Sequence, residues 1–322
     1  MTEASTPRIG ALQDNEPPKP HRSRGADIWA QFSKHKGAML GGGFLIFITL
    51  AVLIGPWLWG VDPQKLDIRN KDIRPLWSGL FSDAKTSWAR PFGTDNLGRD
   101  HMAQILAGGR ASMAVGWAAM LLSLMIGTFI GVLAGFFRRL DGVLMRLTDL
   151  FLSLPILPLL LVAVTLFRQP LRANFGPEGG MFILIVCIIG VTSWMPTARI
   201  VRGDILALKE REFIYAARSI GTRPFAIIRR HLLPNVLSPI VVSATLGLAT
   251  AIITESALSF LGVGFPSDFP TWGKMLADAV PRMSEYPERV LLPGIAISLT
   301  VLGVNYLGDG LRDALDPHIR GR

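Results

Sequence analysis

Long stretches without a charged residue dominate the pattern of hydrophobic and polar positions along the chain. About 20 apolar residues are enough to cross the hydrocarbon core of a bilayer as a helix, whereas long helices of a soluble core keep a polar face. One stretch contains a single carboxylate, Glu255, and the others contain none. The pattern therefore predicts an all-α membrane protein with six transmembrane helices, at residues 37–61, 111–137, 150–167, 179–198, 232–262 and 290–308.

The distribution of Lys and Arg predicts how these helices are oriented. Charged residues make up 18% of the 322-residue chain, below the level of about 25% in soluble domains, and the net charge is +9. Basic residues are more numerous in both tails and in loops 138–149 and 199–231 than on the opposite side. Because loops rich in Lys and Arg stay in the cytoplasm, both termini are predicted to be cytoplasmic. This distribution also accounts for the net charge without a nucleic-acid partner.

Composition shifts divide the chain into five segments. The polar, proline-containing residues 1–28 predict a disordered cytoplasmic tail. Residues 29–61 predict an interfacial helix and the first transmembrane helix, and residues 62–106 predict an extracytoplasmic segment. A transmembrane domain with the other five helices covers residues 107–309, and residues 310–322 form a cytoplasmic C-terminal tail.

The predicted cytoplasmic loop at residues 203–235 has the pattern of a helical hairpin. Its apolar residues recur at helical spacing on one face, while two arginines and a tyrosine share another. A well-capped amphipathic loop would show the same periodicity, so spacing alone leaves two interpretations open, a simple loop and a docking element. The apolar face consists of Leu206, Phe213, Ala217 and Ile220.

Glycine and proline positions predict a capped turn inside this hairpin. Gly221 follows the first helix where a residue with positive φ is favoured. Pro224 suits the first turn of a second helix, with Thr222 or Arg223 as its cap. Pro234 marks the return to the bilayer.

The small residues of the hairpin follow a definite order: Ala216-Ala217, three residues, Gly221, nine residues, then His231-Leu232-Leu233-Pro234. This order resembles the EAA loop of bacterial ABC importer permeases, Glu-Ala-Ala-x₃-Gly-x₉-Ile-x-Leu-Pro. Tyr215 in place of Glu and His231 in place of Ile resemble the dipeptide, oligopeptide and nickel subfamily. The resemblance implies that the hairpin couples to an ATPase subunit through Tyr215, Ala216, Ala217, Gly221, Pro224, Leu233 and Pro234.

Further stretches, in the same order along the chain, are similar to this subfamily. The resemblance covers about residues 27–317 and is closest to the C-type membrane subunit of a peptide-class importer. It implies the type I ABC importer permease fold, with a cytoplasmic EAA coupling hairpin. The stretches are residues 92–100, 109–112, 141–155, 255–264, 272–276 and 305–317.

The resemblance also implies partners. A homologous permease would complete a heterodimer in the lipid bilayer, two ATP-binding subunits would supply energy, and an extracytoplasmic solute-binding protein would deliver the solute. That solute would be a dipeptide, an oligopeptide, or a related cargo such as nickel or an opine. The sequence has no Walker A motif, so we expect ATP to bind to the partners and no cofactor to bind here. Without a nucleophile–base constellation, we expect a non-enzymatic, multi-pass permease of the bacterial inner membrane.

Glu255 is the ionisable residue that lies deep in a predicted transmembrane helix. A carboxylate at mid-bilayer costs about 2.5–3.5 kcal/mol on insertion scales, so it is expected to face protein or water. With Ser256 and Ser259, it predicts either hydrogen-bonded helix packing or a wall of the translocation path. Two other classes stay open: a proton-coupled secondary transporter that uses Glu255, and a membrane anchor without a path.

A polar motif precedes the second predicted transmembrane helix. Asp95 is predicted to cap a helix that begins at Asn96. Two carboxylates and His101 within one turn are more often caps than metal ligands, so no metal site is predicted. With residues 270–275, the motif is a candidate surface for a solute-binding protein. It consists of Gly93, Thr94, Asp95, Gly98, Arg99 and Asp100.

Small residues and prolines predict local packing. Gly127, Gly131 and Gly135 form a stripe that either packs against a helix of the same subunit or forms the seam with a second permease. Prolines in the third and fourth predicted helices indicate kinks. These prolines are Pro155, Pro158 and Pro196.

Overall fold

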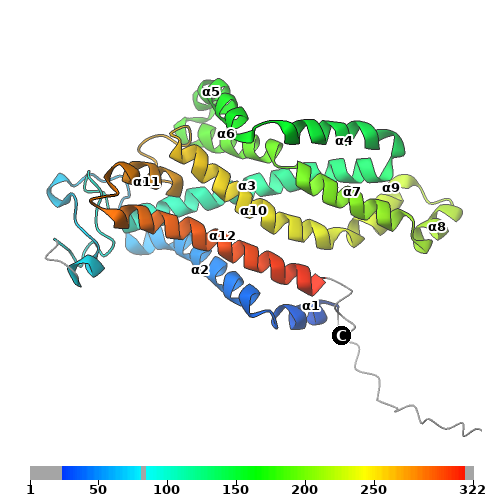
Figure 1. Cartoon of the computed structure of the whole chain (residues 1–322), viewed down its shortest axis with the longest axis horizontal. Helices are drawn as coiled ribbons and strands as arrows, with labels where there is room; N and C mark the ends of the chain where they lie inside the picture. The colour runs from blue at the N-terminus through cyan, green and yellow to red at the C-terminus, as the bar shows by residue number, and fades with distance from the viewer. Residues whose placement is uncertain (1–23, 81–84, 316–322) are drawn as a thin grey trace, which may run out of the picture.

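A computed structural model describes residues 24–80 and 85–315 as a bundle of helices, and within these ranges no β-strand is formed (Figure 1). The parts of the predicted tails in residues 1–23 and 316–322 lie outside the described residues. The main helices are α1 (Arg24–Phe32), α2 (Lys36–Trp59), α3 (His101–Phe136), α4 (Arg138–Ser153), α5 (Ile156–Phe175), α6 (Pro177–Thr192), α7 (Met195–Lys209), α8 (Glu212–Ser219), α9 (Pro224–Ile227), α10 (Leu237–Phe260), α11 (Trp272–Ala279) and α12 (Pro287–Leu315).

Among the described residues, five helices are long and apolar enough to cross a membrane: α2, α3, α5, α10 and α12. The fourth predicted span is divided between α6 and α7, which are bent by 42° at a short break. Pro196 lies in the first turn of α7, where its missing amide hydrogen does no harm, so the predicted kink is confirmed there. With this pair counted as one span, the six-helix prediction is confirmed.

The prediction for the third span was wrong at its start. Residues 138–149, expected to form a loop, belong to helix α4, and the apolar span begins only at Ile156. Leu154 and Pro155 separate the two helices, so the predicted kink at Pro155 is a break between helices. The charged residues of α4 explain the error, because an amphipathic helix has no long uncharged stretch.

The 36-residue helix α3 lies at the centre of the bundle and packs against α2, α6, α7 and α10. It begins at His101, well before the predicted start at residue 111, because the side chain of Asp100 caps it. At Gly127, Gly131 and Gly135, an added Cβ would lie 2.7 Å from atoms of α7. This close approach confirms packing within the subunit as the role of the glycine stripe.

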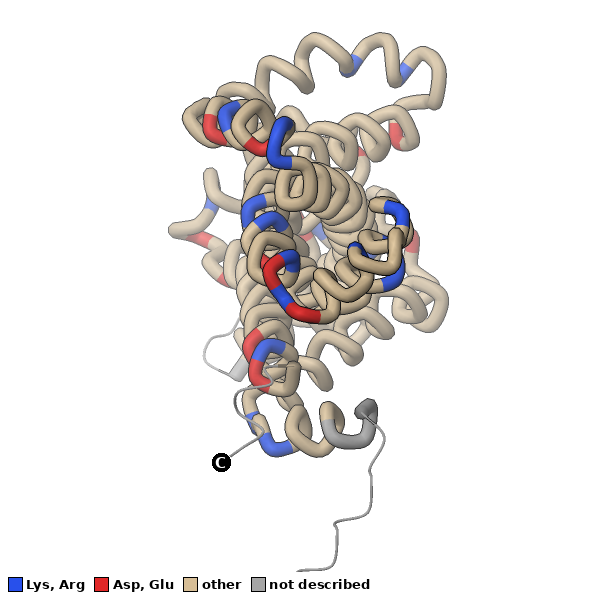
Figure 2. Tube along the Cα trace, turned by 90° about the vertical axis from the view of Figure 1, so that its right-hand side faces the viewer, with Lys and Arg blue, Asp and Glu red and all other residues tan. Residues whose placement is uncertain are grey.

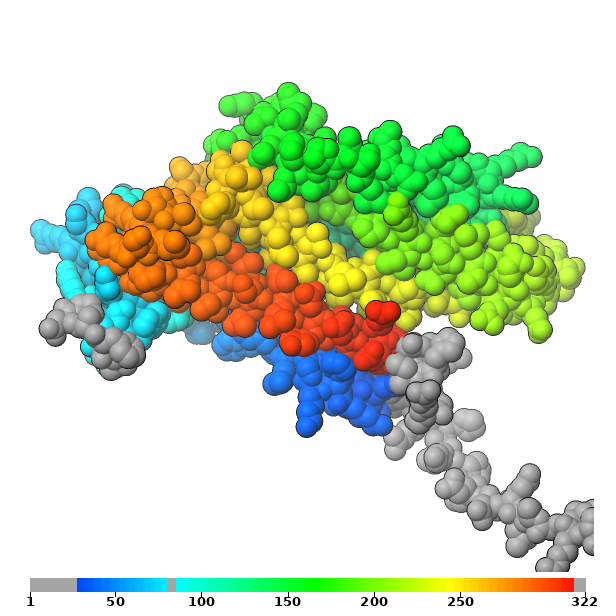
Figure 3. Space-filling view, viewed as in Figure 1, coloured from blue at the N-terminus to red at the C-terminus, as the bar shows by residue number. Residues whose placement is uncertain are grey.

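The two ends of the bundle carry different elements (Figures 1 and 3). One end holds the cyan segment that follows α2, together with α11, and the opposite end holds α8 and α9. Helix α12 runs from the α11 end toward the α8 end and packs against α2 and α1. An added Cβ at Gly310 would lie 3.2 Å from the ring of Phe32, so the first and last described helices meet.

Candidate functional site

The predicted hairpin at residues 203–235 forms a helical elbow at one end of the bundle (Figure 1). Helix α7 ends at Lys209, and α8 follows after a short break. After the turn at Gly221, α9 continues into a π-helical turn, Ile228–Leu232, and a 3-10 turn, Leu233–Asn235. The chain then enters α10, so the elbow connects two membrane-spanning elements directly.

The turn between α8 and α9 has the predicted cap. Gly221 has a φ of +76°, a left-handed conformation that favours glycine. Its N–H donates to the carbonyl oxygen of Arg218 at 2.9 Å, and the N–H of Thr222 donates to that of Ala217 at 3.1 Å. These two bonds form a Schellman motif. Arg223, one of the two predicted residues, is the N-cap of α9, and Pro224 occupies its first turn.

The buried face of the hairpin differs from the predicted one. Phe213 and Ile220 belong to the apolar face that helical spacing predicts, yet their side chains are 43% and 83% exposed. Ile214 is fully buried and Ala217 nearly so. The break before α8 shifts the helical phase, so spacing counted from Leu206 does not carry through it. The apolar cluster that anchors the hairpin contains Val132, Val201, Ile205, Ile214, Ala217, Ile227, Leu232, Val236 and Ile240.

The outer surface of the elbow combines exposed apolar side chains with arginines. Phe213, Ile220 and Phe225 are exposed, and Figure 2, which faces this end, shows Lys and Arg gathered on it. The hydroxyl of Tyr215, which stands at the Glu position of the EAA pattern, donates to the carboxylate of Glu210, and this contact raises the pKa of Tyr215. A mixed apolar and basic tip of this kind is typical of a protein-docking surface.

Two ion pairs hold α4 to α7 near the same end. The guanidinium of Arg202 binds both carboxylate oxygens of Asp141, with 2.7 Å between Nη2 and Oδ2. This contact lowers the pKa of the Asp141 carboxyl. Arg199, one turn earlier on α7, pairs with Asp149. The amphipathic helix α4 is thereby fixed alongside α7, whose C-terminal end leads into the elbow.

The structure encloses Glu255 inside the subunit. Its side chain is completely buried in α10, and the Ser259 hydroxyl donates to Oε1 at 2.7 Å. The hydroxyls of Ser112, Ser256 and Thr271 lie beside the same carboxyl group, although Oε2 has no well-aligned hydrogen bond among the described residues. Ser256 and Ser259 are buried as well. This geometry is that of helix packing between α10, α3 and α11; a role in the translocation path stays a prediction.

The motif before α3 is a tightly folded turn. An added Cβ at Gly93 would lie 2.4 Å from the carbonyl oxygen of Ile73, and one at Gly98 would lie 1.8 Å from that of Asp67. Both glycines have a positive φ, so no other residue fits these positions without strain. The Thr94 hydroxyl donates to the carbonyl oxygen of Asn70 at 2.6 Å and accepts from the Ile73 amide at 3.0 Å.

The predicted cap at Asp95 was wrong. Asp95 closes the turn by accepting from the amides of Leu97 and Arg99, both at 2.8 Å, and by pairing with the Arg99 side chain at 2.6 Å. The residue that caps a helix is Asp100, whose Oδ1 accepts from the Ala103 amide at 2.8 Å. An aspartate at either position could accept a hydrogen bond from the first turn of a helix. The geometry of the turn places Asp100, and not Asp95, at the start of α3.

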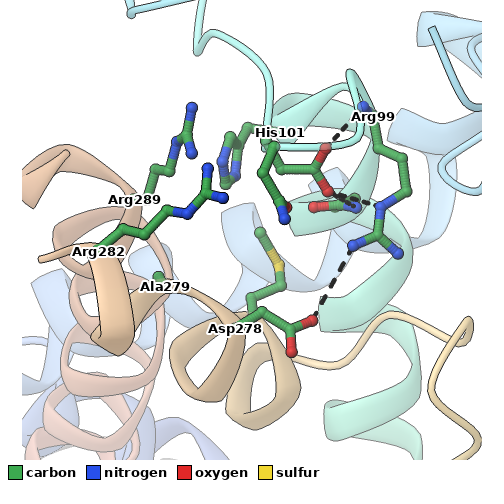
Figure 4. A pocket seen from close by; sticks show the side chains of 10 residues that line it. Arg99, His101, Asp278, Ala279, Arg282 and Arg289 are labelled. Carbon is green, nitrogen blue, oxygen red and sulfur yellow. Dashed lines mark hydrogen bonds and ion pairs between the residues drawn. The ribbon is translucent and has the colours of Figure 1, made fainter. Parts of the chain in front are cut away.

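Sequence reasoning missed a group of charged contacts that tie the segment between α2 and α3 to α11, to α12 and to the residues between them. Arg99 of the turn approaches Asp278 of α11 at 4.0 Å (Figure 4). Arg289, in the first turn of α12, donates to Asp72 at 2.8 Å, and Arg282 approaches the same carboxylate at 3.6 Å. Asp278 and Ala279 of α11 line the adjoining cavity of about 20 Å³, as does His101, whose ring nitrogens have no hydrogen-bond partner among the described residues. The volume suits one water molecule. These contacts join residues far apart in the sequence, so no local sequence pattern predicts them.

Comparison with known families decides the class of this protein. The family described as binding-protein-dependent transport system inner membrane component matches residues 123–321. The chain belongs to this family. The N-terminal transmembrane domain of oligopeptide transport permease C matches residues 23–75 of the permease.

Curated relatives of the permease align over most of its length. The oligopeptide transport system permease protein OppC of Bacillus subtilis is 35% identical over 91% of this chain and 90% of its own length. The dipeptide transport system permease protein DppC of the same organism is 36% identical over 94% of this chain and 88% of its own. A chain of the inward-facing MetNI methionine ABC transporter has the same fold, with a TM-score of 0.52, 20% identity, and coverage of 65% of this permease and 95% of that chain.

These findings confirm the type I importer fold and a membrane permease subunit of an ABC importer. The permease is a multi-pass protein of the inner membrane, and its family works with ATP-binding subunits and a solute-binding protein. They give no support to a proton-coupled secondary transporter.

Proposed function

We propose that this permease imports short peptides or a chemically related solute, driven by ATPase subunits that dock on the hairpin at residues 203–235. The relatives named for oligopeptide and dipeptide transport support the substrate class. The observation that carries the docking role is the rigid elbow with an exposed tip. ATP is hydrolysed by the partners, and this chain transmits their motion to the bilayer.

The elbow has one face fixed to the bundle and one face available to a partner. Its inner face is buried through Ile214 and Ala217, and its turn is closed by the Schellman motif at Gly221. Its outer face presents Phe213 and Ile220 to a partner. Because helix packing resists gradual deformation, displacement of the tip moves α7 and α10 as rigid elements.

The elbow and both termini are cytoplasmic in this proposal. The first and last described helices pack together, and α12 runs toward the end of the bundle that carries α8. The excess of Lys and Arg in loops on that side agrees with retention in the cytoplasm. The turn at residues 93–100 and α11 then face outward, where a solute-binding protein docks.

A homologous permease subunit completes the path as a heterodimer. Helix α5 supports this arrangement, because only 11% of its most apolar 18-residue stretch is buried inside the subunit. Val162, Leu166 and Phe167 are exposed along it. A second permease that packs on these side chains would bury them and place the path between the two subunits.

The proposal is tested by disulfide cross-linking in the assembled transporter. Ile220→Cys, introduced in a Cys187→Ser background, is expected to form a cross-link with a cysteine in the ATPase groove. The matched control, Gly142→Cys on the exposed side of α4, should form none. Cross-linking at Gly142 alone would place the ATPase elsewhere, and uptake driven by a proton gradient without ATP would refute the proposed energy source.

A further inference from the structure

A large cavity opens at the end of the bundle that carries α11. It has a volume of about 540 Å³ and lies between the end of α2, the first half of α3, the start of α6 and the segment after α10. Pockets that hold small organic ligands have volumes of about 300–1,000 Å³. The cavity is distinct from the enclosed surroundings of Glu255 and from the small cavity beside His101.

Small and aromatic side chains form its walls. Ala107, Ala111 and Ala114 occupy one face of α3 at helical spacing, and their short side chains leave the space open. Phe182 of α6 lines the cavity with two further rings, Phe265 and Phe269, which stack with their centroids 4.9 Å apart. The walls therefore suit an apolar or aromatic group of a ligand.

Two charges of opposite sign line the same cavity. Arg110 projects from α3 and Glu178 from the first turn of α6, and both side chains are exposed. Neither makes an ion pair or a hydrogen bond with another residue of the described ranges. Charges at the edge of a membrane-spanning bundle face water or a binding partner rather than lipid.

We propose that this cavity is an acceptor site for a short zwitterionic peptide. The guanidinium of Arg110 binds the C-terminal carboxylate, the carboxylate of Glu178 binds the N-terminal ammonium, and the aromatic rings contact the peptide side chains. The proposal rests on the function proposed above, peptide import. An acyl chain or an apolar helix of the second permease would fill the apolar walls but supply neither counterion. A zwitterionic lipid headgroup carries both charges, and labelling of the cavity wall separates such a lipid from a peptide.

Cysteine protection in the assembled transporter tests the site directly. The single native cysteine is replaced by Cys187→Ser, and Ala114→Cys places a thiol on the cavity wall. We expect a charged, water-soluble methanethiosulfonate reagent to label this thiol, and Ala-Ala to protect it. Protection by N-acetyl-Ala-Ala-amide, which lacks both charges, should need about tenfold more peptide or higher. Gly142→Cys, at the other end of the bundle, should be labelled regardless of peptide.

Charge variants assign the two ends of the peptide. Arg110→Gln is expected to weaken protection by Ala-Ala about tenfold while leaving that by Ala-Ala-amide unchanged, and Arg110→Lys should restore most of it. Glu178→Gln should weaken protection by Ala-Ala but not by N-acetyl-Ala-Ala. If the Arg110 variants fail to assemble, Glu178→Gln alone tests whether the cavity binds a charged end of the peptide.

The site and the proposed function fail in different ways. Absence of ATP-driven Ala-Ala uptake by the unaltered transporter would contradict peptide import. Uptake with no protection, or with equal protection by charged and blocked peptides, would overturn the acceptor site. Failure of the reagent to reach Ala114→Cys would show that lipid or the second permease fills the cavity, and would overturn it too.

Discussion

The N–H of Thr222 donates a hydrogen bond to the carbonyl oxygen of Ala217 at 3.1 Å, across the turn at Gly221. This bond joins the buried face of α8 to the start of the second helix of the elbow. It satisfies a carbonyl group that the end of a helix would otherwise leave free, and it fixes the angle between the two short helices. The elbow is therefore stiff without being a long helix.

Replacement of Gly221 by valine should uncouple the transporter. A β-branched residue at a φ of +76° is strained by about 1–2 kcal/mol, although its Cβ would meet nothing within 4 Å. We expect a normal level of inserted protein and continued ATP hydrolysis with little uptake, measured in proteoliposomes. Gly142→Val, which also has open space around it, is the control. Normal uptake by Gly221→Val would remove the coupling role of the turn.

Variants of two isoleucines in the hairpin should distinguish residues that anchor it to the bundle from residues that contact the ATPase. Ile214 is fully buried, so Ile214→Ala should destabilise the hairpin by about 2–5 kcal/mol and lower the thermal midpoint of the purified permease. Ile220 is 83% exposed, so Ile220→Ala should leave that midpoint unchanged and weaken ATPase binding in co-purification. Equal effects of both variants on stability would show that the assignment of the two faces is incorrect.

Alanine substitutions at Gly131 and Gly203 should have different effects on the stability of the bundle. At Gly131 an added Cβ would lie 2.7 Å from the Ala198 carbonyl oxygen, so Gly131→Ala should destabilise the bundle by about 1–3 kcal/mol. At Gly203 it would meet nothing within 4 Å, so Gly203→Ala should be neutral or stabilising by up to about 1 kcal/mol. Thermal denaturation in detergent compares them, and a stable Gly131→Ala variant would refute close packing of α3 on α7.

The Asp141–Arg202 pair should give stability that depends on pH. Its contact lowers the folded-state pKa of Asp141 below the ordinary value of 3.8. The contribution is therefore complete above pH 3.8 and is lost as the pH falls through the lowered pKa. At pH 7, Asp141→Asn should lower stability by up to about 1 kcal/mol, because the pair is partly exposed, and the difference from the unaltered protein should shrink below pH 3.8. A constant difference across this range would exclude the ion pair as its source.

Features set by neighbouring residues were predictable from the sequence. Apolar length predicted the spans, and the Gly221 and Pro224 pattern predicted the cap, because each depends on a few adjacent positions. The apolar face assigned by spacing does not coincide with the buried face of α8, because the break before Glu212 resets the helical phase. The contact of Asp72 with Arg289 joins residues 217 positions apart, and no periodicity encodes such a pairing.

The most direct test of the account is the side of the membrane on which the elbow lies. Arg218→Cys in a Cys187→Ser background is treated with a membrane-impermeant maleimide in intact cells. Trp88→Cys is the control, because Trp88 is 88% exposed in the segment predicted to be extracytoplasmic. We predict that Trp88→Cys is labelled in intact cells and Arg218→Cys only after lysis. Labelling of Arg218→Cys in intact cells would place the elbow outside, where no ATPase could reach it.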